Sequence, residues 1–335
     1  MRDAISVAEA ATARTFSARD LPLYGMIRYH LGWADESFRP ARFDAGKRIR
    51  PIICMHACGA VNGDPANAAP LAAAIEILHN FTLVHDDIQD RSATRRHRST
   101  IWSLWGESQA INVGDAMFAL GQHTLLRLFD LPISVERLAR VVRGYNDVAL
   151  RIVEGQVLDL GFEERWDISA AEYLGMIGGK SAAIISYAAW SGALVGGADF
   201  GVSERFRAFG EALGLGFQIR DDLLGIWGET SVTGKRKGDD IRRRKKSLPI
   251  ITLAANAAPH EVDRLRAIYA VPEISERDFD WIVQLLQRYE VEDQLQSVVS
   301  DYHERARNLI DDAAEDNSSR RALVELLERL STRAF

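Results

Sequence analysis

The amino-acid sequence predicts an all-α protein, and three observations support that fold class. Prolines are widely spaced, with none between Pro70 and Pro132 or between Pro132 and Pro249, so long helices are permitted there. Apolar residues recur at spacings of three and four over long segments. Alternating patterns that are typical of strands are scarce. We therefore expect one domain over residues 1–335, a bundle of about ten to thirteen helices around a central cavity.

The composition is that of an ordinary globular protein. The chain has 335 residues, of which 47% are hydrophobic and 26% charged, and this excludes a disordered or fibrous chain. The formal net charge is −6 at pH 7, so a general nucleic-acid binder is disfavoured and no nucleic-acid partner is expected. The two cysteines, Cys54 and Cys58, cannot form a disulfide framework and favour buried helical thiols.

Long helices are expected over three segments with helical periodicity, at residues 71–90, 137–160 and 204–227. The apolar segment 181–198 is short and is interrupted by serines and glycines, so it is interpreted as a buried helix and not as a membrane span. The N-terminal residues contain no apolar signal core. We expect a cytoplasmic protein without a membrane anchor. Loops are expected at residues 63–65, 91–100, 131–132, 228–246 and 258–259.

Three aspartates stand at the end of the first long helix. Asp86, Asp87 and Asp90 occupy positions i, i+1 and i+4, so at about 100° per residue they fall within one arc of about 100°. Unpaired, such carboxylates repel one another and raise their own pKa values, so a counter-cation is expected. Hard oxygen ligands that leave room for water and phosphate suit Mg²⁺. The alternative is a solvated acidic helix end, which the apolar neighbours disfavour.

A second aspartate pair, Asp221 and Asp222, lies near the end of the last long helix, with Gln218 about 60° from Asp221 on the same face. Each aspartate cluster is followed by a loop rich in cations, at residues 91–98 and 235–246. A nucleic-acid or nuclear-localisation patch is the general interpretation of such a run. The combination of two aspartate clusters with two basic loops indicates instead a small polyanion, held through both metal and cations.

These motifs resemble those of the trans-isoprenyl diphosphate synthases, the polyprenyl synthetase family. HDDIQDRSATRRHR is similar to the family's first aspartate-rich motif, and FQIRDDLLG with the downstream TGKRKGDDIRRRKKSLP is similar to its second motif and lysine loop. Further matches are AGKRIRP, EILHNFTLVHDD, the Glu154-Gly155-Gln156 triplet and GGKSA at residues 178–182. The matches follow the family's order from about residue 44 to 250. They imply the isoprenoid-synthase helical fold and a short-chain synthase of the geranylgeranyl diphosphate type.

The resemblance implies a role for each matching residue. The ligands of a cluster of three Mg²⁺ ions would be Asp86, Asp90 and Asp221, with Asp87 and Asp222 in support. The allylic diphosphate would be bound by Arg95, Lys180, Lys235 and Lys245. The isopentenyl diphosphate would be bound by Lys47, Arg50, His79 and Arg96. Oxygen dipoles toward the carbocation would come from Ser181 and Gln218.

The implied reaction is Mg²⁺-dependent, head-to-tail prenyl transfer. The allylic diphosphate ionises while metal ions and cations stabilise the charge on the departing diphosphate. The double bond of isopentenyl diphosphate then attacks the allylic cation. Proton loss to the departed diphosphate completes one five-carbon addition. No side-chain nucleophile is needed, and the sequence shows no Ser/His/Asp or Cys/His arrangement.

Three positions depart from the family's pattern. Gly225 stands where the second motif usually ends in Asp, Ser181 replaces the commoner Thr, and His97 follows the arginine pair where Gly is usual. None of the three is a primary metal ligand, so an active enzyme is expected.

Product length is predicted from Phe81, which stands five residues before the first aspartate and is followed by Thr82. In the family this position lies near the floor of the product tunnel, and an aromatic residue there resembles short-chain synthases. The first motif lacks two extra residues, which resembles the geranylgeranyl type. We predict a C20 product, with C15 next. The alternative is that Phe81 is a core residue.

Other classes fit the sequence less well. Class I terpene cyclases pair an aspartate motif with an Asn/Ser/Glu triad, and the lookalike Asn146, Leu150 and Glu154 has a leucine that cannot ligate metal. A phosphohydrolase built on His79 and His85 would leave the basic loops without a purpose. A regulatory partner of another synthase would have degraded aspartate motifs. A longer-chain polyprenyl synthase stays open as an alternative.

The resemblance also implies partners. The substrates would be isopentenyl diphosphate and an allylic diphosphate. Family members are usually homodimers, and the apolar helix near Trp102–Leu126 is the candidate face for a second copy of the chain.

Overall fold

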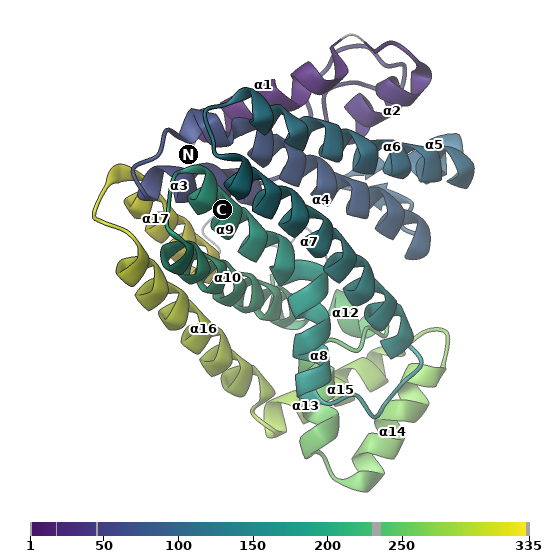
Figure 1. Cartoon of the computed structure of the whole chain (residues 1–335). Coiled ribbons are helices and arrows are strands. Elements are labelled where there is room, and N and C mark those ends of the chain that lie inside the picture. The colour runs from purple at the N-terminus through teal and green to yellow at the C-terminus, as the bar shows by residue number, and fades with distance from the viewer. Residues whose placement is uncertain (1, 18, 45, 230–235, 333–335) are drawn as a thin grey trace. The chain divides into compact units, whose positions relative to one another are not determined.

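The computed structural model describes residues 2–17, 19–44, 46–229 and 236–332, and Figure 1 shows them as an array of helices. Strands among the described residues are limited to one two-stranded hairpin and an isolated bridge between Ala34 and Pro40. The all-α prediction is therefore confirmed. The described helices outnumber the ten to thirteen expected, because several of them are short.

The chain groups into two compact units. The first comprises Met1–Ala149, Tyr187–Phe206 and Ala313–Leu323, and the second comprises Leu150–Ser186, Arg207–Asp312 and Val324–Phe335. Five of the described helices contain a boundary between the units: α7 (Val135–Phe162), α9 (Ala183–Val195), α10 (Phe200–Trp227), α16 (Val291–Ala313) and α17 (Ser318–Thr332). The single-domain organisation expected from the sequence stays a prediction.

The first unit holds most of the N-terminal elements. They are α1 (Arg2–Phe16), α2 (Pro22–His30), α3 (Ile49–Ala60), the 3₁₀ helix η1 (Pro65–Ala68), α4 (Ala69–Gln89), β1 (Thr94–Arg95), β2 (Arg98–Ser99), α5 (Ile101–Trp105), α6 (Glu107–Leu125) and the 3₁₀ helix η2 (Leu126–Asp130).

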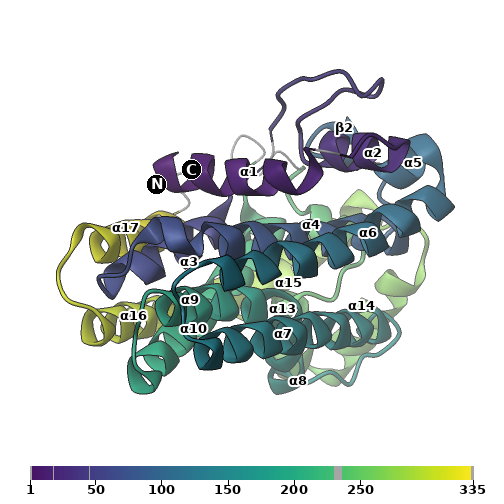
Figure 2. The same cartoon turned by 45° about the horizontal axis from the view of Figure 1, so that its top comes forward.

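Helix α4 is the central helix of the first unit, and it lies beside α6 in both views (Figures 1 and 2). Every residue from Leu71 to Leu78 is buried, as expected for a helix that is apolar on all sides and surrounded by others. Val84 in its last turns joins a core with Val113 and Met117 of α6. This packing on all sides holds the C-terminal end of α4 in place, and that end carries the first aspartate cluster.

The second unit contains α8 (Ala170–Ile177), the π-helical turn η3 (Gly178–Ala182), α12 (Asp239–Arg242), α13 (Leu248–Asn256), α14 (Pro259–Ala270), α15 (Glu276–Arg288) and all but the last residue of α16 (Val291–Ala313). Its core includes Ile219 and Leu223 of α10, which pack with Tyr173 of α8 and Leu248 of α13. The buried face of α10 thus runs directly beside the second aspartate pair.

Local sequence signals explain where the key helices begin and end. Ser169 and Glu172 form a capping box at the start of α8, with the Glu172 amide donating to Ser169 Oγ at 3.2 Å and the Ser169 amide to Glu172 Oε2 at 2.9 Å. Helix α4 ends where Arg91 adopts a positive φ of 50°, which a right-handed helix cannot continue.

Two segments differ from the sequence-based expectation. The apolar helix near Trp102–Leu126 is divided into α5 and α6 at Gly106, whose φ of 86° interrupts the helix. The loop expected over residues 228–246 contains the one-turn helix α12, which follows Gly238 at a φ of 71°. The expected helices at 71–90, 137–160 and 204–227 correspond to α4, α7 and α10.

The apolar segment 181–198 forms the end of the π-helical turn and α9. Cys54 and Cys58 are buried free thiols on α3, as predicted. None of the helices in the described ranges is long and apolar enough to cross a membrane.

Candidate functional site

The C-terminal end of α4 presents carboxylates in two different environments. Asp87 is 3% exposed, whereas Asp86 is half-buried and Asp90 is exposed. The negative end of the helix dipole adds to the repulsion among these carboxylates, so a cation bound there is favoured. The prediction that Asp86 and Asp90 face a metal while Asp87 supports them is compatible with this division.

Asp87 is held by Arg95, whose Nε donates to Oδ1 at 2.8 Å. Burial is the main cause that raises the pKa of Asp87 to about 6. Arg95 opposes this shift, while Asp86 and Asp90 add to it. Arg95 therefore already has an anionic partner in this structure, although the resemblance implies that it binds a diphosphate.

The basic loop after α4 forms a hairpin in which Thr94 pairs with Ser99 and Arg95 with Arg98. Its two central residues, Arg96 and His97, have φ angles of 51° and 59°. Positive φ at both positions is the requirement of a type I′ turn, which usually contains Asn and Gly. The family's usual glycine after the arginine pair thus corresponds to a position where His97 is strained.

Arg98 stabilises the packing of the first unit. Its guanidinium donates to the carbonyl oxygens of Tyr29 and Ala34 at 2.8 and 3.0 Å. It also lies 3.8 Å from the ring centre of Tyr29 and 3.9 Å from that of Phe43. Both terminal nitrogens donate and two aromatic rings contact the guanidinium, so Arg98 joins three segments of the chain.

Arg96 and Arg50 belong to a cationic group around His79. The Arg96 guanidinium lies against Gly46, where a β-carbon would come within 2.6 Å of Nη2. Burial, followed by Arg50 and Arg96, holds the pKa of His79 well below its usual value. Burial is also the main cause that lowers the pKa of Arg50 to about 10, and Arg96 lowers it further. Crowded cations of this kind are stabilised by an incoming anion.

Arg48 is compensated within the protein. It has a left-handed backbone, with φ 50°, and its buried guanidinium pairs with Glu76. A second carboxylate, of Glu9, lies 3.7 Å from its Nη2. The exposed Lys47 precedes Arg48 in the chain. Helix α3 begins directly after Arg48 and carries the half-buried Arg50. The structure therefore brings Arg50, His79 and Arg96 together in the first unit.

Phe81 packs inside the first unit against two neighbours. Its ring lies 5.4 Å from that of Phe118 on α6 and 5.0 Å from the His85 ring one turn later on α4. The Thr82 hydroxyl donates to the carbonyl of His79 at 2.8 Å, within its own helix. Phe81 is therefore a partly buried aromatic of the α4–α6 packing, and its role in chain length stays a prediction.

In the second unit, Asp222 is the buried member of the aspartate pair, at 1% exposure. The Tyr173 hydroxyl donates to its Oδ2 at 2.7 Å, and Gln218 Nε2 donates to its Oδ1 at 3.3 Å. Burial is the main cause that raises the pKa of Asp222 to about 6, opposed chiefly by Lys245. Asp221 is half-buried, so this pair divides into a buried and an accessible carboxylate as the first cluster does.

Lys245 is a cation surrounded by carboxylates. Burial alone would lower its pKa, but Asp222 and then Asp240 outweigh that effect, and the pKa is raised. Lys245 is therefore fully protonated at neutral pH. The role of Lys245 in binding the allylic diphosphate stays a prediction.

Lys180 and Ser181 lie on the π-helical turn η3, a local geometry that is frequent at functional sites. The Lys180 ammonium pairs with Asp159 of α7. A β-carbon at Gly155 would come within 2.3 Å of the Lys180 amide nitrogen, so the glycine of the Glu-Gly-Gln triplet is required for α7 to pack against this turn.

Several contributing residues were not identified from the sequence. Tyr173 and Asp240 act on Asp222, while Asp159 pairs with Lys180 and contributes to the raised pKa of Lys245. Arg48 pairs with Glu76 beside the cationic group. Asp159 stands three residues after the Glu-Gly-Gln triplet, and Asp240 lies in the lysine loop. Their closeness to these motifs was the sequence feature that could have identified them. Lys235, assigned to the allylic diphosphate, lies outside the described residues.

Comparison with known proteins agrees with these features. The family model described as polyprenyl synthetase matches residues 33–286. A (2E,6E)-farnesyl diphosphate synthase of Mycobacterium tuberculosis is 43% identical over 231 residues, which are 69% of this chain but 63% of that protein. A geranylgeranyl diphosphate synthase of the same species is 40% identical over 251 residues, covering 75% of this chain and 70% of that one.

A solved structure shows the same likeness over the whole fold. The crystal structure of a polyprenyl synthetase from Streptomyces coelicolor A3(2) superimposes with a TM-score of 0.91 at 32% identity, covering 98% of both chains. The matched family model covers both aspartate clusters, the cationic group around His79 and the π-helical turn. The chain therefore belongs to the polyprenyl synthetase family.

Proposed function

We propose that this protein is a divalent-metal-dependent prenyltransferase, which condenses isopentenyl diphosphate with an allylic diphosphate to give a short-chain trans-prenyl diphosphate. Its curated relatives of similar sequence carry the names of farnesyl and geranylgeranyl diphosphate synthases. The activity of this chain is inferred from them and from the residues described above.

The cationic group around His79 carries the proposal. Among the described residues, no carboxylate forms an ion pair with Arg50 or Arg96. Burial lowers the pKa of both, Arg96 lowers that of Arg50 further, Arg48 and Arg95 lower that of Arg96 further, and Glu76 only partly opposes these shifts. A site of this kind gains from a bound polyanion that lacks its own counter-cations. Chain elongation needs such a site for a second diphosphate, whereas cyclisation of one allylic diphosphate does not.

The carboxylates of the two clusters fit a hard divalent cation. In the described part of the chain, no group of three or more His, Cys, Asp or Glu side chains is placed to hold a metal by itself. Mg²⁺ commonly binds through one or two carboxylates and completes its coordination with water and substrate phosphate. Asp86 and Asp90 in the first unit and Asp221 in the second would supply those carboxylates, and three ions per site are proposed from the resemblance.

The chain's own residues would bind and orient the two substrates. As the resemblance implies, Arg95, Lys180 and Lys245 would bind the allylic diphosphate, and Arg50, Arg96 and His79 would hold the isopentenyl diphosphate. When bound, a divalent cation would neutralise negative charge that develops on the departing diphosphate. The carbon–oxygen bond of the allylic diphosphate breaks, the double bond of isopentenyl diphosphate forms the new carbon–carbon bond, and a proton leaves to the released diphosphate.

The product is proposed to contain 20 carbons, with 15 next, because Phe81 presents an aromatic ring from α4 toward Phe118 of α6. The alternatives are less well supported. The triad lookalike of a terpene cyclase contains Leu150, which is 62% exposed and cannot ligate metal. A longer-chain synthase would differ from the proposed enzyme only in the number of carbons in its product.

The test is incubation of the purified protein with Mg²⁺, radiolabelled isopentenyl diphosphate and one allylic diphosphate of 5, 10 or 15 carbons, followed by dephosphorylation and sizing of the products. We expect Mg²⁺-dependent incorporation that ends at C20, and none with EDTA. A cyclase would release a hydrocarbon or alcohol without isopentenyl diphosphate. Absence of both products would refute the proposal.

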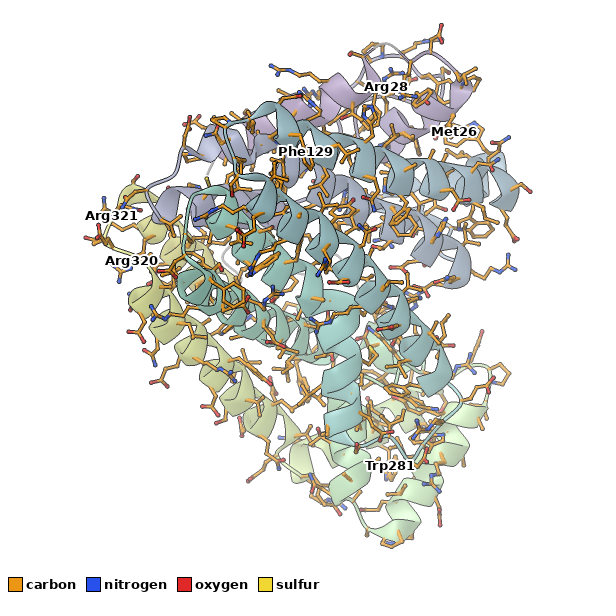
Figure 3. The ribbon with its side chains drawn as sticks, viewed as in Figure 1. Met26, Arg28, Phe129, Trp281, Arg320 and Arg321 are labelled. Atoms are coloured by element: carbon orange, nitrogen blue, oxygen red, sulfur yellow. The ribbon has the colours of Figure 1, made fainter. Side chains whose placement is uncertain are left out.

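We also propose that the protein is a homodimer. The apolar face of α6 is largely used inside the first unit, yet Ile111 on α6 and Leu126 and Phe129 on the following 3₁₀ helix η2 are 47%, 53% and 49% exposed. Phe129 is labelled in Figure 3. A monomeric mass by sedimentation equilibrium would contradict this.

A further inference from the structure

Glu76 is a buried carboxylate on α4, three residues before His79. Its side chain is 8% exposed. One oxygen, Oε1, accepts hydrogen bonds from Arg48 Nη1 and, at 3.1 Å, from Asn80 Nδ2. The other oxygen, Oε2, is buried and accepts no hydrogen bond from a described residue. A buried carboxylate is costly unless cations compensate it, so the charge of Glu76 depends on the arginines around it.

The cationic group around His79 has more positive than negative charge. Burial and then four arginines lower the pKa of His79, namely Arg50, Arg96, Arg95 and Arg48. Arg48 is paired with Glu76, and Arg95 is paired with Asp87. The other two arginines form no ion pair with a carboxylate in the described ranges. Because its pKa lies well below the usual value, His79 is uncharged at neutral pH, and the group has a net positive charge that Glu76 reduces.

Glu76 acts on arginines with which it forms no ion pair. After burial, it is the largest cause that shifts the pKa of Arg50, and it opposes the lowering. It also opposes the lowering of the pKa of Arg96. Charges attract over several ångströms in a protein interior, so one carboxylate stabilises three arginines although it bonds to only one. Glu76 thus has the electrostatic effect on this group that a bound anion would have.

A second carboxylate near Arg48 has a different position. Glu9 of α1 lies with Oε1 3.7 Å from Arg48 Nη2, and its side chain is 26% exposed. Its other oxygen lies 3.4 Å from Nη1 of Arg42, which is exposed. The charged groups that shift the pKa of Arg50 include Glu76 and not Glu9. Glu9 therefore contacts the same arginine as Glu76 from outside the cationic group, and it offers a matched control.

We infer that Glu76 is an internal counter-charge of the cationic group, which competes with isopentenyl diphosphate for Arg50 and Arg96 and thereby limits the affinity of this site. The inference rests on the proposed function and deepens it, because it makes Glu76 a positioning residue for the second substrate. Its consequence is the reverse of ordinary damage to a site. Removing the charge of Glu76 should destabilise the free protein and yet strengthen the binding of a diphosphate.

The first experiment uses Glu76→Gln, which removes the charge and keeps the shape. The amide oxygen can accept the bonds from Arg48 and Asn80, and the amide nitrogen replaces an oxygen that accepts none from a described residue. Calorimetric titration of the full-length protein with inorganic diphosphate in EDTA measures the affinity. We expect binding to be about fivefold tighter or more, since a negative charge near the anion is removed. The melting temperature without diphosphate should fall, because Arg48 loses its closest counter-charge.

The control is Glu9→Gln, which should change the affinity for diphosphate by less than about twofold, because solvent screens this partly exposed charge. A second pair of variants tests the same balance. Arg48→Gln should weaken diphosphate binding, since Glu76 then attracts Arg50 and Arg96 without its own partner. Adding Glu76→Gln to Arg48→Gln should recover about fivefold in affinity. This double variant leaves neither charge of the buried pair uncompensated, so it decides the matter if Glu76→Gln alone does not fold.

Steady-state kinetics locates the effect. In Glu76→Gln the KM for isopentenyl diphosphate should fall several-fold, and the KM for the allylic diphosphate should stay unchanged. Equal or weaker diphosphate binding in the folded variant, or the same gain in Glu9→Gln, would overturn the inference while the proposed function stands. A wild-type protein that binds diphosphate but transfers no prenyl group would overturn the proposed function, and the titrations would still decide the role of Glu76. A wild-type protein that binds no diphosphate in EDTA would contradict both.

Discussion

The Tyr173 hydroxyl donates a 2.7 Å hydrogen bond to Oδ2 of Asp222, linking α8 to α10 inside the second unit. Both groups are buried. A buried carboxylate needs hydrogen-bond donors to remain ionised. The bond thus holds Asp222 in place beside Asp221, the accessible carboxylate that is proposed to face the metal.

Tyr173→Phe should therefore destabilise the protein by about 2 kcal/mol, because a donor to a buried charged group is lost. Urea unfolding at pH 7 measures this. The control is Tyr302→Phe on α16, whose hydroxyl makes no hydrogen bond to a described residue, and which should cost little. Equal stability of the two variants would contradict the role given to Tyr173.

The pH dependence follows from Asp87 and Asp222, whose pKa values burial raises to about 6. Folding thus favours their protonated forms. Their contribution to the stability of the metal-free protein is fully present below about pH 4 and is lost as the pH rises through 6. Metal binding has the opposite dependence, because protons compete with the cation.

We therefore expect Mn²⁺ affinity to rise between pH 5 and 7 and then to level off, while the melting temperature without metal falls over part of the same range. Titrations at several pH values measure both. Asp222→Asn should remove the part of the pH dependence that comes from Asp222, both in the affinity for Mn²⁺ and in the melting temperature. An affinity for Mn²⁺ that is constant from pH 5 to 7 would be inconsistent with the raised pKa values.

Arg96 and Arg98 offer a matched comparison, two residues apart on one hairpin. Arg96→Gln should raise the KM for isopentenyl diphosphate by roughly tenfold and leave stability unchanged or improved, because the guanidinium is crowded by other cations. Arg98→Gln should cost about 2 kcal/mol or more of stability, since two carbonyl hydrogen bonds and two ring contacts are lost. Steady-state kinetics and urea unfolding distinguish the two roles, and a reversed pattern would be incompatible with them.

His97→Gly should stabilise the protein by about 1 kcal/mol, because glycine adopts a positive φ without the strain that histidine carries. The measurement is the midpoint of urea unfolding. Thr94→Gly, at a strand position of the same hairpin, is the control and should destabilise. A loss of stability in His97→Gly would show that the histidine side chain contributes more than its backbone costs.

Phe81→Ala should lengthen the product beyond C20, since it removes the ring that packs on Phe118. Product sizing by thin-layer chromatography measures this. The control is Phe200→Ala, at an aromatic residue that is 57% exposed, which should leave product length unchanged. An unaltered profile in Phe81→Ala would make Phe81 a residue of helix packing only.

The long helices were predictable because periodicity and proline spacing are local properties. The segment predicted at 71–90 is α4, Ala69–Gln89, and that predicted at 204–227 is α10, Phe200–Trp227. The break at Gly106 and the hairpin of residues 94–99 were not predicted, because a glycine and two residues at positive φ act through the backbone and leave the apolar pattern unchanged.

The sequence by itself determined the family, the helical class and the ionisable residues of the two aspartate clusters and basic loops, since spacing along a helix places residues on a common face. Tertiary packing alone decided which of these groups are buried and which partners they have. It buried Asp87 and left Asp90 exposed. It gave Arg98 two carbonyl partners and kept Arg96 in the cationic group, and it placed Asp240 against Gly225. Burial and charge pairing depend on segments far apart in the chain, so no local pattern encodes them.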